Sequence, residues 1–201
     1  MSHTMELPRQ IVVGEKNLGQ VGEFLSSLSN PKKVSIICGK NVKKIIGKEI
    51  DRSLKNAKIL AVWHLAKSNK EKETVAIQKK VKSAKSDIII GLGGGRSVDI
   101  AKLCSFNLKK PFISIPTSAS HDGIASPFVS VRGEKPHSIV ATAPLGVFVD
   151  LDIIKKAPKK LLASGCGDLM AKITAVHDWE LGRDKIGEYY GRYSANLASM
   201  S

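Results

Sequence analysis

Short apolar runs alternate with longer amphipathic stretches along most of this chain. Runs that are apolar throughout are typical of strands buried on both faces, whereas apolar residues spaced three and four apart are typical of helices that pack by one face. Strands are expected at Ile11–Val13, Val34–Cys38, Ile59–Trp63, Asp87–Gly91, Phe112–Ile115 and Val147–Val149. Helices are expected at Leu18–Leu28, from Asn41 through Ile50, at Glu71–Ala84 and beyond the glycines that follow Gly91. This alternation predicts an α/β fold built on a parallel sheet.

Two segments depart from the alternation. Ala125–Val131 and Ile139–Thr142 flank the polar segment Arg132–Pro136, a pattern that predicts a β-hairpin. From Pro158 onward the chain is rich in alanine, leucine and glycine and has helical character without a further strand. We expect an α/β domain over 1–157 and the beginning of an all-helical domain over 158–201. The second domain is expected to be incomplete, because about forty residues are too few for a core of their own.

The segment Gly91–Lys102 carries the strongest chemical signal. Three consecutive glycines, Gly93 to Gly95, connect an expected strand to an expected helix. Glycines permit a tight turn that brings backbone N–H groups close to a phosphate, and the helix presents its positive N-terminal end to the same charge. The turn predicts a site for a dinucleotide or a phosphorylated substrate. It is not the usual G-x-G-x-x-G pattern, because Arg96 stands where the third glycine belongs.

Two other segments carry polar groups that could reach the same site. Thr117–Ser126 follows the strand at Phe112–Ile115 and supplies hydroxyls, backbone N–H groups and a carboxylate at the ligand-binding edge of the sheet, although ordinary loops contain the same residue types. Gly165–Lys172 places Asp168 near the start of an expected helix. There its carboxylate is either a helix cap or a ligand for a cation.

Composition limits the classes of protein to consider. The chain has 201 residues, of which 42% are apolar and 5% aromatic, as in a globular protein. No apolar run reaches the roughly 20 residues that span a bilayer, and the first residues do not resemble a signal peptide, so the cytoplasm is the expected location and no membrane insertion is expected. Cys38, Cys104 and Cys166 are widely separated and are interpreted as small buried thiols rather than disulfides or a metal cluster.

The formal net charge of +14 could attract nucleic acid or an anionic small molecule. Between Lys67 and Lys85, however, the lysines are interleaved with glutamates and with apolar residues, as on the solvated face of a helix. Aromatic residues of the kind that stack on bases are not interleaved with them. Nucleic acid is therefore not expected as a partner, and binding that falls steeply with salt would be the sign of the alternative.

Three segments occur in order along the chain: Gly91–Lys102, Thr117–Ser126 and Gly165–Lys172, with Pro144–Asp150 between the second and the third. In this order they resemble the glycerol dehydrogenase and dehydroquinate synthase-like superfamily. The sequence His121-Asp122-Gly123, followed by Ser126-Pro127, resembles the archaeal sn-glycerol-1-phosphate dehydrogenase family. The resemblance implies a nucleotide-binding α/β domain, a helical domain, and a metal and substrate in the cleft between them. It implies NAD(P)H-dependent, zinc-assisted reduction of dihydroxyacetone phosphate to sn-glycerol 1-phosphate, the backbone of archaeal membrane lipids.

The same resemblance assigns individual residues. It places the cofactor pyrophosphate at Gly94, Gly95, Arg96, Ser97, Val98 and Asp99, and the nicotinamide side at Thr117, Ser118, Ala119, Ser120 and Ser126. Asp122 is expected to face the substrate. Asp168 is expected to ligate zinc, to touch the substrate and to take part in catalysis.

This sequence departs from the family pattern at the residues that bind the metal. Its other two ligands are histidines in the helical domain, and they have no counterpart up to Ser201; His177 is interpreted as a surface or core histidine. One carboxylate does not hold zinc firmly, since catalytic zinc usually has three protein ligands. Two alternatives therefore stay open, a glycerol dehydrogenase-like polyol oxidoreductase and a nucleotide-binding fragment without activity. The oligomeric state is also open, a homo-oligomer included.

The cofactor preference is read from Cys38–Asn41, where the strand expected to face the adenine ribose ends without an acidic residue. NAD-selective sites usually have an Asp or Glu there, whereas a nearby cation accommodates the 2′-phosphate of NADP. Because Lys40 follows this strand, we expect NADPH to be accepted along with NADH.

Overall fold

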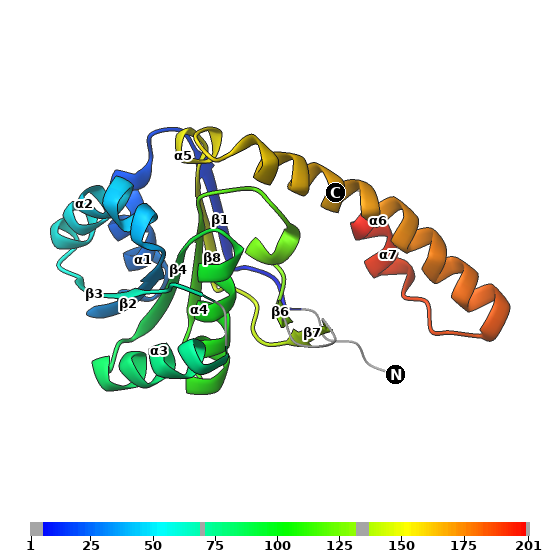
Figure 1. The fold of residues 1–201 in the computed structure, drawn as a ribbon, viewed down its shortest axis with the longest axis horizontal. Helices are drawn as coiled ribbons and strands as arrows, with labels where there is room; N and C mark the ends of the chain where they lie inside the picture. The colour runs from blue at the N-terminus through cyan, green and yellow to red at the C-terminus, as the bar shows by residue number, and fades with distance from the viewer. Residues whose placement is uncertain (1–5, 69–70, 132–136, 200–201) are drawn as a thin grey trace.

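A computed structural model describes residues 6–68, 71–131 and 137–199 of the chain (Figure 1). Its main feature is a six-stranded, entirely parallel sheet in the order β1-β8-β5-β4-β2-β3. The strands are β1 Gln10–Gly14, β2 Lys33–Cys38, β3 Leu60–Leu65, β4 Ile88–Gly93, β5 Phe112–Pro116 and β8 Gly146–Asp150. The α/β class and the parallel sheet expected from the sequence are confirmed.

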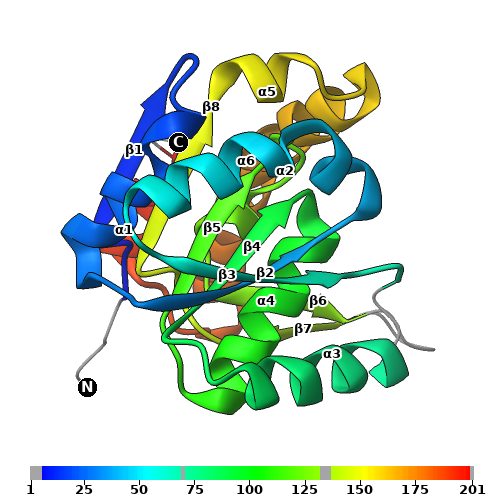
Figure 2. The same cartoon turned by 90° about the vertical axis from the view of Figure 1, so that its left-hand side faces the viewer.

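Helices cover both faces of this sheet. The helices after the first three strands are α1 Val21–Ser29 with the short 3-10 turn η1 Leu18–Gln20 before it, α2 Lys40–Asn56 and α3 Glu71–Ala84, and β4 is followed by α4 Gly95–Leu108. Figure 2 shows α1 and α2 on one side of the sheet and α3 and α4 on the other. The four helices expected in this domain are present, and α2 continues past Ile50 to Asn56. β3 continues to Leu65, past its expected end at Trp63, because its pairing with β2 continues to Cys38.

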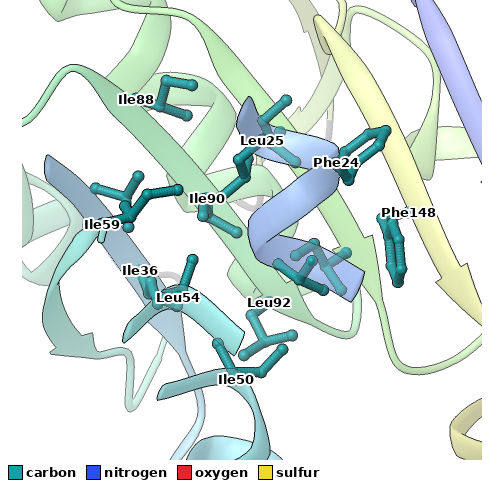
Figure 3. Packing of buried hydrophobic residues seen from close by; sticks show 14 of the residues in the cluster. Phe24, Leu25, Ile36, Ile50, Leu54, Ile59, Ile88, Ile90, Leu92 and Phe148 are labelled. Carbon is teal, nitrogen blue, oxygen red and sulfur yellow. The ribbon is translucent and has the colours of Figure 1, made fainter. Parts of the chain in front are cut away.

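The core consists of two apolar clusters separated by the sheet. Neighbouring residues of one strand point to opposite faces, so Ile36 and Ile90 join the cluster under α1 and α2, whereas Ile37 and Ile89 join the cluster over α3 and α4. Figure 3 shows the first cluster, in which Phe24 meets Phe148 with a ring-centroid distance of 5.2 Å. Central strands buried on both faces explain why the sequence shows continuous apolar runs.

The expected hairpin is also present. β6 Phe128–Val131 pairs antiparallel with β7 His137–Val140. The connecting segment 132–136 lies outside the described residues. Between β5 and β6 the chain forms a loop that includes the short 3-10 turn η2 Asp122–Ile124.

After β8 the chain is helical, with α5 Leu151–Lys155, α6 Lys159–Ile186 and α7 Arg192–Ser199. Figure 1 shows α6 extending away from the sheet with α7 folded back along it. Apolar side chains along α6 are exposed, including Met170 at 70% and Ile173 at 73%. The helix starts directly after Pro158, so Asp168 lies well inside it, and its interpretation as a helix cap is wrong.

The cysteine interpretation is correct for two of three residues. Cys38 and Cys104 are buried and free, and burial raises the pKa of their thiols to about 11 and about 12. These thiols stay protonated and inert at neutral pH. Cys166 is exposed on α6, because that helix packs few of its side chains against the rest of the described chain.

A buried polar cluster lies at the β3 edge of the sheet. The Ser35 hydroxyl is within hydrogen-bond distance of His64 Nε2, at 3.0 Å, and of the Ser86 hydroxyl, at 2.9 Å. Burial lowers the pKa of His64, and the positive charge of Lys80 lowers it further. The folded protein therefore holds His64 in its neutral form at pH values where the unfolded chain is already protonated.

We expect the free energy of unfolding to fall as the pH drops below about 6.5, the pKa of an unperturbed histidine. In that range the unfolded state binds more protons than the folded state, because the folded pKa of His64 is the lower of the two. His64→Gln keeps a hydrogen-bonding group and removes the titration, so its stability should fall less between pH 7.5 and pH 5.5, both chosen roughly a unit from that pKa. Urea unfolding of both proteins at the two pH values measures this; equal losses would contradict it.

Candidate nucleotide-binding cleft

The candidate site lies where the order of the sheet reverses. From β2 the chain moves outward to β3 and then returns to β4 on the other side of β2. Ligands of open α/β sheets bind outside the carboxyl ends of the strands at such a point. Three connections meet there: β2 to α2, β4 to α4, and the loop after β5.

The turn after β4 is formed by glycines for steric reasons. Gly93 has φ +145°, a conformation that other residues rarely adopt, and a Cβ there would lie 2.9 Å from the Ser97 hydroxyl. Gly94 is the N-cap of α4, and its carbonyl accepts hydrogen bonds from the N–H groups of Ser97 and Val98. The N–H groups of Gly95 and Arg96, ahead of these two, have no carbonyl of the helix to bind, which is the geometry that binds a phosphate.

The turn and the following loop are joined through their backbones. The N–H of Thr117 donates to the carbonyl of Gly93 at 3.0 Å. Next to this bond, the hydroxyl of Ser118 is buried, with the residue 3% exposed, and it has no hydrogen-bond partner among the residues described. A Cβ on Gly94 would lie 3.4 Å from that hydroxyl. A buried hydroxyl left without a partner beside a bare backbone turn fits a polar ligand such as a pyrophosphate.

A cavity of about 300 Å³ extends from this turn between α2 and the start of α6. Gly94, Thr117 and Ser118 line its polar end. Its apolar walls come from α2 and from the α5–α6 connection, namely Val42, Ile45, Ile46, Ile153, Ala157, Pro158 and Leu161. An apolar slot that opens onto a phosphate-binding turn fits the adenosine half of a dinucleotide.

A second cavity, of about 520 Å³, lies on the other side of the turn and is lined mainly by polar residues. Gly95, Arg96 and Asp99 of α4 meet Ser120 and His121 of the loop, with Ser164 and Asp168 of α6 on the far side. A third cavity next to it includes Ala119, Asp122 and Asp168. The carboxylates expected at the substrate therefore lie beside the hydroxyls expected at the nicotinamide.

His121 lines the second cavity and lies against two glycines. Its Nδ1 accepts a hydrogen bond from the N–H of Gly123 at 2.9 Å, so the neutral ring carries its proton on Nε2. A Cβ on Gly95 would lie 2.3 Å from Nε2, and a Cβ on Gly123 would lie 2.4 Å from Cε1. The Nε2 edge of the ring thus lies against the first residue of α4, and both residues line the second cavity.

Helix α6 docks on the loop through three residues on one face. A Cβ on Gly165 would lie 2.0 Å from the carbonyl oxygen of Ala119, so only glycine allows this approach. One turn later the Asp168 carboxylate accepts a hydrogen bond from the N–H of Asp122 at 2.8 Å, and the Lys172 ammonium pairs with the Asp122 carboxylate at 2.7 Å. These contacts set the distance between the two carboxylates.

Most of the predicted cofactor residues lie together, with exceptions. Val98 is fully buried in the core under the sheet, and Ser97 is buried beside Gly93, so their side chains line neither the first nor the second cavity. Arg96 lines the second cavity, and its guanidinium donates to the carbonyl of Lys67 at 2.8 Å. Ser126 lies in the loop after β5, where its N–H donates to the carbonyl of Asp122. It lines neither the first nor the second cavity.

The described residues do not provide a complete metal site. Within 6–68, 71–131 and 137–199 no group of three or more His, Cys, Asp or Glu side chains could hold a metal ion. His177 is exposed on α6 and lies 3.9 Å from Glu180, as expected for a surface histidine. The donors present do not fit a zinc site, since Asp168 stands alone as the expected ligand.

Two residues of the site were not predicted from the sequence, namely His121 as a wall of the cavity and Lys102. The buried Lys102 ammonium donates to two carbonyls of the loop. A signal for Lys102 existed, because it follows the apolar Val98 by four residues on the same face of α4, where a buried charge needs a partner.

Comparison with known proteins identifies the family. A sequence profile of the iron-containing alcohol dehydrogenases matches residues 12–158. The chain belongs to the iron-containing alcohol dehydrogenase family. Within this family, it is 66% identical over 200 residues to a glycerol-1-phosphate dehydrogenase [NAD(P)+] of Nitrosopumilus maritimus and 59% identical to the protein of that name from Cenarchaeum symbiosum. The resemblance found in the sequence is confirmed.

Each of these two alignments includes the whole chain but 56% of the relative, so the chain spans little more than half their length. Among solved structures, a glycerol dehydrogenase from Schizosaccharomyces pombe superposes with a TM-score of 0.85 at 21% identity, over 98% of this chain and 51% of that one. A likeness at such identity supports the fold alone. No helix among the described residues is long and apolar enough to cross a membrane.

Proposed function

We propose that this chain takes part in the NAD(P)H-dependent reduction of dihydroxyacetone phosphate to sn-glycerol 1-phosphate, a step that supplies the backbone of archaeal membrane lipids. The observation that carries the proposal is the 66% identity, over the whole chain, to a protein named for the oxidation of glycerol 1-phosphate with NAD(P)+. Residues 1–157 are assigned to cofactor binding, and residues 158–201 to a helical domain that faces the substrate.

The site supports this chemistry through binding and orientation. When bound, the nicotinamide supplies the hydride that reduces the ketone. The turn at Gly94 and Gly95 holds the pyrophosphate, and Thr117 to Ser120 lie beside the nicotinamide. Asp122 and Asp168 face the neighbouring cavity, where they would orient the hydroxyl group of the substrate. No step is assigned to a zinc ion, because Asp168 is the one expected ligand among the residues described.

The direct test is turnover by the chain itself. NADPH and dihydroxyacetone phosphate are mixed with the protein, and the loss of nicotinamide absorbance and the chirality of the product are measured. Formation of sn-glycerol 1-phosphate supports the proposal. Faster reduction of unphosphorylated dihydroxyacetone would instead indicate a glycerol dehydrogenase-like polyol oxidoreductase.

A second candidate is nucleotide binding without turnover, which the incomplete set of metal donors favours. It predicts saturable binding of NADPH, seen as a change in nicotinamide fluorescence, with no product from either ketone even when Zn²⁺ is added. Turnover on addition of Zn²⁺ would exclude it.

The preference for NADPH is proposed to depend on Lys40, the exposed first residue of α2, next to Asn41 at the adenosine cavity. Lys40→Asp should weaken NADPH binding by about tenfold or more and leave NADH binding similar or stronger, since a carboxylate repels the 2′-phosphate and binds the ribose hydroxyl. Lys44→Asp, one turn along the same helix, is the control. Unchanged NADPH affinity in Lys40→Asp would count against this assignment.

A further inference from the structure

Lys102 is the largest side chain that is completely buried in the described chain, at 0% exposure. Its Nζ donates to the carbonyl of Gly123 at 2.8 Å and to the carbonyl of Phe128 at 2.7 Å. Placing an ammonium group in a protein interior is costly unless its hydrogen bonds are satisfied. An apolar residue would fill the same space on α4 without that cost, so the two carbonyls distinguish this position as one that uses an ammonium group.

Both carbonyls belong to the segment that closes the loop after β5. Gly123 lies in η2, directly after His121 and Asp122, and Phe128 begins β6. The loop residues expected at the nicotinamide lie immediately before and within this segment. One ammonium therefore fixes both ends of the segment to the helix whose first turn binds the pyrophosphate.

The charges around Lys102 are arranged to keep it protonated at neutral pH. Burial lowers its pKa to about 8, while Asp99 on its own helix and Asp122 in the loop act in the opposite direction. The negative charges that favour the protonated lysine are therefore those of Asp99 and Asp122, and His121 of the loop acts on Asp99. The two carbonyl dipoles then bind a cation, which strengthens both hydrogen bonds.

We propose that Lys102 is a positioning residue that holds the nicotinamide-binding loop at a fixed distance from the pyrophosphate-binding turn. This inference rests on the proposed function, because it assumes that the cleft binds a nicotinamide dinucleotide. Lys102 does not touch the cofactor, because its ammonium is bound to the two carbonyls. It acts through the backbone of residues 123–128, and so through Ser120, His121 and Asp122 before them.

The test compares two ligands that share the adenosine and pyrophosphate but differ in the nicotinamide. Lys102→Met retains the length of the side chain and removes the two donated hydrogen bonds. We expect NADPH affinity to fall by about tenfold or more, whereas 2′-phospho-ADP-ribose, which lacks nicotinamide, should bind within about twofold of wild type. Titration calorimetry measures both. Lys110→Met, an exposed lysine just after α4, should change neither.

The outcomes are distinguishable. Wild-type protein that binds neither ligand would refute the proposed function. Wild-type protein that binds both, with Lys102→Met losing affinity for both equally or for neither, would overturn the positioning role, because a general structural defect lowers both affinities together. If Lys102→Met does not fold, Lys102→Gln, whose amide can donate to a carbonyl, is compared with the same two ligands. Because glutamine can keep one of the two donated hydrogen bonds, a smaller loss restricted to NADPH supports the proposal, and an equal loss for both ligands or no loss for either overturns it.

Discussion

Replacing Asp150 by alanine is expected to lower the free energy of unfolding by roughly 3 to 5 kcal/mol. The substitution removes a buried carboxylate and leaves the backbone N–H groups that donate to it without an acceptor. Asp150 is the last residue of β8 and is 3% exposed. One carboxylate oxygen accepts from the N–H groups of Asn17 and Leu18, at 2.9 and 3.2 Å. The other accepts from Asp152 and Ile153, at 2.9 and 3.3 Å.

These four hydrogen bonds join distant parts of the chain. Asp150 caps α5 and at the same time binds the turn before α1, more than a hundred residues earlier in the sequence. Alanine leaves four N–H groups without an acceptor, two of them in the buried turn at Asn17. Because Ile153 lines the adenosine cavity, the loss of the α5 cap should also weaken NADPH binding.

Urea unfolding measures the effect on stability. Asp150→Asn retains one carbonyl oxygen and should fall between wild type and Asp150→Ala, since an amide can satisfy only one of the two pairs of donors. Asp178→Ala removes an exposed aspartate of α6 and should change stability by less than about 0.5 kcal/mol. A loss in Asp150→Ala no larger than in this control would show that the backbone groups find other partners.

How much of this fold the sequence predicts depends on how local the signal is. The strands of the sheet were predicted because each is a short apolar run buried on both faces, and the glycine turn because its geometry depends on its own residues. The long-range hydrogen bonds of Lys102 and Asp150 could not be predicted from the local sequence. Asp152 and Ile153 are local partners of Asp150, but the carbonyl of Gly123 is 21 residues from Lys102 and the N–H of Asn17 is 133 residues from Asp150, and a distant backbone group has no sequence signature.

In the candidate site, too, the residues placed by local sequence and topology could be predicted, and those placed by contacts between distant segments could not. Residues of the turn and of the loop after β5 lie at the carboxyl ends of parallel strands, a rule that follows from topology. The position of Asp168 beside Asp122 depends on the path of α6 over the loop. The sequence indicates helical character from Pro158 onward but places Asp168 near the start of a helix, whereas α6 runs unbroken from Lys159 through Gly165 and Gly167, although glycine inside a helix usually costs stability.

Replacing Gly165 by alanine is expected to separate α6 from the loop. The added Cβ would lie 2.0 Å from the carbonyl oxygen of Ala119 and 3.5 Å from the Cα of Ser120, both backbone atoms that cannot rotate away. The helix must therefore shift, and the hydrogen bond from the N–H of Asp122 to Asp168 should break. A displacement of about 1 Å at a reacting centre can cost roughly 100-fold in rate. If the chain reduces dihydroxyacetone phosphate, we expect a loss of that order in kcat/KM.

Gly167→Ala is a matched control, because nothing lies within 4 Å of its Cβ position and the same substitution is made two residues along the same helix. It should raise helix stability by up to about 1 kcal/mol without moving α6. Hydrogen exchange at the amide of Asp122 reports docking independently of activity: it should accelerate in Gly165→Ala and stay as in wild type in Gly167→Ala. Equal exchange in the two variants would mean that the loop follows the helix, and that the positions of Asp122 and Asp168 are coupled more tightly than one hydrogen bond and one ion pair require.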